Sequence, residues 1–230
     1  MNLALARRLA AELVGSALLA ALVIGSGIAA QRLSPGDTGL QLFENAFATA
    51  LGLPVLILIF GPVSGAHFNP VVSLVDSVSG MRAWRDTSLY IPAQIAGCIL
   101  GAMLANLMFG DAAVSISTTD RLTPAHFLSE IVATAGLILV IFALARTDRA
   151  HITPAAVGAY IGAAYFFTSS ASFANPAITV GRMFSDTFAG IAPTSAPGFI
   201  AAQLVGAALA VLLLRWLYPA RASSQIAENR

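Results

Sequence analysis

The chain has 230 residues, of which 57% are hydrophobic and 10% are charged. Soluble domains carry about 25% charged residues, so this composition excludes an ordinary soluble protein and predicts a membrane protein. The twelve cationic residues, all arginine, nearly balance the eleven acidic residues, so no nucleic-acid partner is expected.

The apolar run near the N-terminus shows no cleavage pattern, and we interpret it as the first membrane span. A span needs about 20 mostly apolar residues to cross a hydrocarbon core of about 30 Å. Six segments qualify, in chain order Leu9–Ala30, Leu40–Phe60, Leu89–Met108, Phe127–Leu144, Ala155–Ser170 and Phe199–Tyr218. The sequence therefore predicts an all-α membrane protein with six transmembrane helices in one domain, residues 1–230.

Arginine is distributed unevenly around these spans. With six spans, eight arginines fall on one side of the membrane: Arg7, Arg8, Arg82, Arg85, Arg146, Arg149, Arg221 and Arg230. The other side holds Arg32, Arg121 and Arg182. Because arginine-rich loops remain in the cytoplasm, we expect a multi-pass protein of the inner (plasma) membrane with both termini cytoplasmic.

Three pairs of segments recur in the same order along the chain. The pairs are "AELVGSALLAALVI" at Ala11 with "SEIVATAGLILVIF" at Ser129, "SGAHFNPVVSLVD" at Ser64 with "SASFANPAITVGR" at Ser170, and "AQIAGCILGAMLA" at Ala93 with "AQLVGAALAVLLL" at Ala202. Each half, about 1–110 and 120–230, holds three spans. Because three is odd, the second half is inverted in the membrane relative to the first.

Each half also carries an Asn-Pro pair outside the spans, Asn69-Pro70 in the first and Asn175-Pro176 in the second. Asparagine is a preferred helix N-cap, and proline is favoured at the first helical position. About ten helix-compatible residues follow each pair, enough to reach through half of the membrane. The sequence thus predicts two re-entrant half-helices that meet at mid-depth, where their positive ends repel cations.

These features resemble the major intrinsic proteins, the aquaporins and aquaglyceroporins. The resemblance covers nearly the whole chain and rests on the two matched motifs, on "SGAHFNP" before the first, and on a glutamate in the first and fourth spans. It implies an aquaporin-like fold, a homotetramer in the lipid bilayer with one pore per protomer, and small neutral solutes as partners. The second motif keeps Ala177, whereas Val71 makes the first a mild departure from Asn-Pro-Ala.

A larger departure concerns the selectivity filter. Family members usually carry arginine directly after the second motif, where this chain has Ile178. The family spacing implies Thr49, Ala163 and Ser172 at the other three filter positions. This set is small and uncharged, which favours a wide pore for water and for larger neutral solutes such as glycerol-like polyols.

The stretch "SFANPAITVGRMFSDTFAGIAP" and the arginine-free filter are similar to a bacterial branch of aquaglyceroporins associated with arsenic-resistance operons. That similarity implies passage of neutral arsenite or methylated arsenicals. The hydroxyls of arsenite can exchange hydrogen bonds with asparagine, threonine and serine side chains. The single cysteine, Cys98, offers no thiolate cluster, so we expect no metal site and no cofactor.

Four ionisable residues of the spans and the re-entrant segments have two open interpretations. Arg182 either stands at the outer mouth in place of the filter arginine or snorkels to the interface and pairs with Asp186. Glu12 and Glu130 support the re-entrant loops, as the family implies, or couple transport to an ion. His67 either orients its loop or faces the inner vestibule.

Three functions therefore compete on sequence grounds. The first is a passive channel, the second an ion-coupled secondary transporter that uses Glu12 and Glu130, and the third a structural membrane protein with a closed pore. No motif brings together a nucleophile, a base and an orienting group, so an enzyme is not expected.

Overall fold

The computed structural model describes residues 3–219, and within them the chain folds into α-helices and one 3₁₀ turn, with no strand. The elements are α1 (Leu3–Leu33), α2 (Thr38–Ser64), α3 (Pro70–Val78), α4 (Trp84–Met108), α5 (Pro124–Arg146), η1 (Ala150–Ile152), α6 (Thr153–Phe167), α7 (Pro176–Arg182) and α8 (Ala196–Leu217). The Arg221 and Arg230 used for the orientation prediction lie outside the described residues.

Five of these helices, α1, α2, α4, α5 and α8, are long and apolar enough to cross a membrane. The helix of the remaining predicted span, α6, has 15 residues and reaches about 22 Å. We predicted that this span would continue to Ser170, but the helix ends at Phe167. It ends there because Thr168 adopts an extended backbone, and its hydroxyl donates a hydrogen bond to the Ala164 carbonyl at 2.6 Å.

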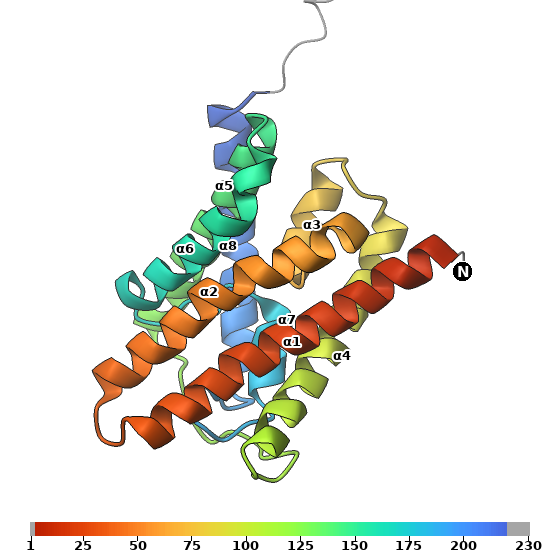
Figure 1. The fold of residues 1–230 in the computed structure, drawn as a ribbon. Helices are drawn as coiled ribbons and strands as arrows, with labels where there is room; N and C mark the ends of the chain where they lie inside the picture. The colour runs from red at the N-terminus through yellow and green to blue at the C-terminus, as the bar shows by residue number, and fades with distance from the viewer. Residues whose placement is uncertain (1–2, 220–230) are drawn as a thin grey trace, which may run out of the picture.

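The helices pack in the same pairs in both halves of the chain. Helix α1 packs along α4 and α2, and the corresponding α5 packs along α8 and α6 (Figure 1). The short helices α3 and α7 contact α4 and α8, and they also contact each other. Contacts between α2 and α6, and between α7 and both α4 and α1, join the two halves.

Close approach of the long helices depends on glycine. A Cβ atom at Gly97 of α4 would lie 2.3 Å from the Leu13 carbonyl oxygen of α1. At Gly206 of α8, which corresponds to Gly97 in the repeat, a Cβ atom would lie 2.5 Å from the Ile131 carbonyl oxygen of α5. Small residues at such crossings let two helix backbones touch, which drives helix association in a membrane.

We therefore expect Gly97→Ala to destabilise the folded protein by about 1–3 kcal/mol, because the added methyl group overlaps the α1 backbone. Gly61→Ala is the matched control, since a Cβ atom at Gly61 of α2 meets no atom within 4 Å. The unfolding temperature of the purified protein in detergent should fall for the first variant and should stay the same or rise for the second. Equal unfolding temperatures for the two variants would contradict this account of the crossing.

Candidate permeation site

The two half-helices begin in the same way. Asn69 and Asn175 have extended backbones, and their side-chain oxygens accept hydrogen bonds from the Val71 amide at 3.1 Å and the Ala177 amide at 2.9 Å, respectively. Pro70 and Pro176 are the first residues of α3 and α7. The predicted asparagine caps and helix starts are therefore present in both halves.

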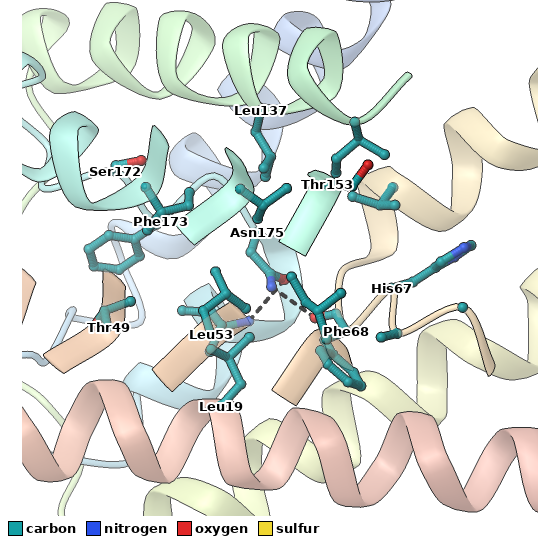
Figure 2. Close-up of a pocket in the computed structure, with 18 of the residues that line it drawn as sticks. Leu19, Thr49, Leu53, His67, Phe68, Leu137, Thr153, Ser172, Phe173 and Asn175 are labelled. Atoms are coloured by element: carbon teal, nitrogen blue, oxygen red, sulfur yellow. Dashed lines mark hydrogen bonds between the residues drawn. The ribbon is translucent and has the colours of Figure 1, made fainter. Parts of the chain in front are cut away.

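The same asparagines join the two halves through their amide nitrogens. Asn69 Nδ2 donates to the Ala174 carbonyl at 2.8 Å, and Asn175 Nδ2 donates to the Phe68 carbonyl at 2.8 Å. Figure 2 shows Asn175 directed at Phe68 in the middle of the site. The N-termini of α3 and α7 therefore abut, as the inverted repeat predicts.

Glu12 of α1 holds the loop that precedes α3. Its carboxylate is fully buried and accepts hydrogen bonds from the Ser64 hydroxyl at 2.6 Å and from the Gln94 amide at 2.8 Å. It also accepts from the backbone amides of His67 at 3.0 Å and Phe68 at 2.8 Å. These four hydrogen bonds offset the free-energy cost of burying a charged carboxylate among apolar helices.

Glu130 of α5 has the corresponding set of partners before α7. It accepts from the Ser170 hydroxyl at 2.6 Å and the Gln203 amide at 2.7 Å. It also accepts from the backbone amides of Phe173 and Ala174, each at 2.9 Å. Both glutamates therefore fix loop backbone, and neither contributes to the cavity wall described below.

These carboxylates hold backbone that is unfavourable by itself. In the first loop, Ala66 and Phe68 have positive φ near +51°. In the second loop, Ala171, Ser172 and Ala174 have positive φ between +47° and +58°. A left-handed conformation costs about 1–2 kcal/mol for a residue with a side chain. The charged hydrogen bonds to glutamate offset this cost and give the loops their shape.

A cavity of about 270 Å³ runs past the point where the half-helices meet. Figure 2 shows Thr49, Ser172 and Phe173 at one end, Asn175 in the middle, and His67 and Thr153 at the other end. Most of the remaining wall is aliphatic, including Leu53 of α2. The cavity therefore has an apolar wall with a few polar groups at both ends and at the centre.

Three of the four expected filter residues, Thr49, Ser172 and Ile178, line this cavity. Ala163 does not, because it lies on the exposed face of α6. Tyr165 lines the cavity instead, and its hydroxyl lies 3.2 Å from the Thr49 hydroxyl. Two residues along a helix turn the side chain by about 200°, so these positions face opposite ways.

The sequence analysis did not identify Tyr165 as a cavity residue, because it placed the filter position by counting residues back from Asn175. That count assumes that the loop between α6 and Asn175 has the length usual in the family. A signal for its orientation exists within α6 itself. Val157, Ile161 and Tyr165 are spaced by four residues, are all buried and all line the cavity. Residues at this spacing share one face of a helix.

His67 and Arg182, which the sequence singled out, lie near opposite ends of the cavity. His67 lines its wall, and its Nδ1 lies 2.9 Å from the Ser73 hydroxyl, so it both faces the vestibule and orients its loop. Asp76 lines the same end and accepts from Arg82 Nε at 2.9 Å.

Arg182 lies behind the opposite end of the cavity, against the Phe173 ring, and is 2% exposed. The alternative pairing of Arg182 with Asp186 is not observed, because Asp186 accepts from the Thr118 amide at 2.9 Å and Arg182 donates to the Ala189 carbonyl. The Arg182 side chain does not line the cavity.

An apolar helical bundle in which two inverted half-helices meet beside an elongated cavity defines a membrane channel. The family comparison agrees, since the model of the major intrinsic proteins matches residues 1–174. The chain belongs to the major intrinsic protein family, and it is a membrane channel rather than an enzyme.

Individual relatives support this assignment. The chain is 50% identical to "Aquaglyceroporin AqpS" of Rhizobium meliloti over 94% of this chain and 93% of that protein. It is 30% identical to the "Glycerol uptake facilitator protein" of Streptococcus pneumoniae over 88% of this chain and 95% of that protein. The X-ray structure of the aquaglyceroporin from Plasmodium falciparum shares the fold, with a TM-score of 0.69 at 21% identity over 91% of this chain and 95% of that one.

The position of Tyr165 leads to a direct test. Tyr165→Ala should widen the Thr49 end of the cavity and raise glycerol permeability relative to water permeability. Ala163→Val should leave both permeabilities unchanged, because that side chain faces away from the cavity. Stopped-flow light scattering of proteoliposomes measures both solutes, and a response at position 163 but not at 165 would reverse the assignment.

Proposed function

We propose that this chain is a passive channel for small uncharged solutes: water, glycerol-like polyols, and arsenite or methylated arsenicals. The observation that carries the proposal is the reciprocal pair of bonds that places Asn69 and Asn175 head to head beside the cavity. Each half-helix directs its positive end to the same point, which disfavours cations but not neutral solutes. Relatives named as an aquaglyceroporin and a glycerol uptake facilitator support the solute class.

The Thr49 end of the cavity suits a solute with several hydroxyl groups. Thr49, Tyr165 and Ser172 bring hydroxyls to this end, and Ile178 brings no charge. The Ser172 hydroxyl has no hydrogen-bond partner among the described residues. Neutral arsenite and glycerol are compact and rich in hydroxyls, so either can exchange hydrogen bonds with these groups while its less polar parts contact the aliphatic wall.

The geometry disfavours the ion-coupled alternative. Glu12 and Glu130 are both 0% exposed, and each carboxylate accepts four hydrogen bonds. A carboxylate that binds and releases an ion during each transport cycle needs access to the solute path, and neither glutamate lines the cavity. Their role as loop supports follows from this arrangement.

We further propose an orientation for the channel. Arg82 contacts the Ser64 carbonyl at the end of α2, Arg8 pairs with Asp86 at 2.8 Å, and Arg146 contacts the Leu214 carbonyl near the end of α8. These helix ends form the arginine-rich face, which belongs in the cytoplasm of a cell whose inner (plasma) membrane holds the protein.

The assembly that we propose is a homotetramer in which each protomer is one channel domain made of two inverted repeats. Large apolar side chains of α2, among them Phe43, Phe47 and Leu51, are exposed along one face of the helix. In the membrane this face needs an apolar neighbour, which is a second protomer or lipid. The mass of the detergent-solubilised protein, corrected for bound detergent, measures the number of protomers.

A flux experiment separates the passive channel from its alternatives. Proteoliposomes that contain the protein should swell with glycerol and arsenite at rates that are linear in solute concentration and unaffected by proton or sodium gradients. Saturation at low solute concentration together with dependence on a gradient would indicate a secondary transporter. Flux no greater than that of protein-free liposomes would indicate a closed structural protein.

Glu130→Gln should lower the free energy of unfolding in detergent by about 3 kcal/mol, because an amide nitrogen replaces an oxygen that accepts one backbone and one side-chain hydrogen bond. Any folded fraction should transport glycerol with the same independence from gradients as the wild type. A variant that folds normally but changes only the response to a gradient would favour coupling.

The uncharged filter generates a further prediction. Ile178→Arg should bring a guanidinium into the Thr49 end of the cavity, where Ile178 lines the wall. We expect glycerol and arsenite permeability to fall more than water permeability, because the charged side chain narrows the path and binds water. Equal losses for all three solutes in stopped-flow measurements would argue that position 178 does not shape the path.

A further inference from the structure

Two guanidinium groups lie near the Phe173 ring at the Thr49 end of the cavity. The Cζ atom of Arg182 lies 3.5 Å from the centroid of this ring, and the Cζ atom of Arg121 lies 5.7 Å from it. Phe173 lines the cavity, whereas neither arginine does. The aromatic ring therefore separates two positive charges from the solute path.

Backbone carbonyls rather than carboxylates hold these arginines. Arg182 Nε donates to the Ala189 carbonyl, and Arg121 donates to the carbonyls of Gly190 at 2.6 Å and Phe188 at 2.7 Å. Among residues 3–219, neither arginine has a carboxylate within ion-pair distance. The carbonyl dipoles fix the two guanidinium groups without cancelling their charge.

Other charged groups around the cluster do not neutralise it. The charge of Glu130 acts on Arg182 without direct contact, and its carboxylate is already committed to four hydrogen bonds. Asp120 and Asp186 lie on the exposed outer loops, where water and salt screen their charge. Two cations and one buried anion therefore leave a net positive charge next to the end of the path.

The placement of Arg182 fits its distance from Ile178. The two residues are four positions apart on α7, so Arg182 lies about one turn beyond the position where the family resemblance expects the filter arginine. Its side chain packs against the Phe173 face, which attracts cations through the ring quadrupole. Phe173 is itself held by edge-to-face contact with Phe199, at 5.1 Å between ring centroids.

We propose that Arg182, supported by Arg121, is a second electrostatic barrier of this channel against cations, including hydronium, in addition to the half-helix ends, and that it acts from behind Phe173 rather than in the lumen. This inference rests on the proposed channel function. A cation at the Thr49 end meets like charge through a medium of low dielectric, whereas a neutral solute meets only the aromatic wall and the hydroxyls. The arrangement keeps the path uncharged and wide and still selects against ions.

The test removes one charge at a time from the full-length protein in liposomes that contain a pH-sensitive dye. A potassium gradient with valinomycin drives protons inward, and glycerol swelling is measured on the same preparation. Arg182→Met should raise proton influx about tenfold or more and change glycerol flux by no more than about twofold. Arg182→Lys, which keeps the charge, should restore low proton influx.

Arg149→Met is the matched control, because Arg149 is exposed on the arginine-rich face and its loss also removes one charge. Its proton influx should equal that of the wild type. Arg121→Met covers the case in which Arg182→Met does not fold, and it should raise proton influx to a smaller extent, since Arg121 lies farther from the Phe173 ring.

Unchanged proton influx in a folded Arg182→Met or, failing that, a folded Arg121→Met variant would overturn the inference. An equal rise in proton and glycerol flux in Arg182→Met would also overturn it, because a non-selective leak assigns Arg182 to holding the outer loop in place. Wild-type glycerol flux at the level of protein-free liposomes would instead overturn the proposed channel function and is recognised before any variant is compared.

Discussion

The structure depends on two half-helices that begin in the interior of a membrane protein. Their first turns and the loops before them leave backbone amides and carbonyls that the surrounding hydrocarbon cannot satisfy. Asn69 and Asn175 satisfy part of this demand by capping their own helices and by donating to the opposite loop, and Glu12 and Glu130 satisfy the amides before each cap. Without these four side chains, the chain could not place backbone at mid-depth, and no path would form beside it.

The inverted repeat explains why a few polar residues suffice. Each half supplies a glutamate, an asparagine and a glutamine in equivalent places. Each asparagine also donates a hydrogen bond to a loop carbonyl of the opposite half. The halves differ mainly where the path leaves the centre. Asp76 bonds to Arg82 at one end of the cavity, while Arg182 stacks on Phe173 at the other. A common scaffold therefore carries two different chemical environments along one path, and this asymmetry can set which solutes and ions enter from each side.

The sequence by itself determined the number and order of the apolar helices, the two helix starts at Asn-Pro, and the glutamates that serve them. These features follow from local signals, namely apolar length, N-capping and internal repetition, which act over a few residues. The same signals favoured a fifth span that ran to Ser170. The three residues beyond Phe167 instead belong to the loop, because hydrogen bonding at Thr168 ends the helix.

Only the tertiary structure decided which side chains reach the path. The rotation of α6 turns Tyr165 inward and Ala163 outward, and that rotation depends on packing against α2, where Gly158 and Gly162 meet Pro54 and Ala50. The place of Arg182 depends likewise on the Ala189 carbonyl and on the Phe173 ring, which lie in different loops. Spacing along the chain cannot fix such contacts, because a two-residue difference in a helix turns a side chain by about 200° and a loop can absorb it.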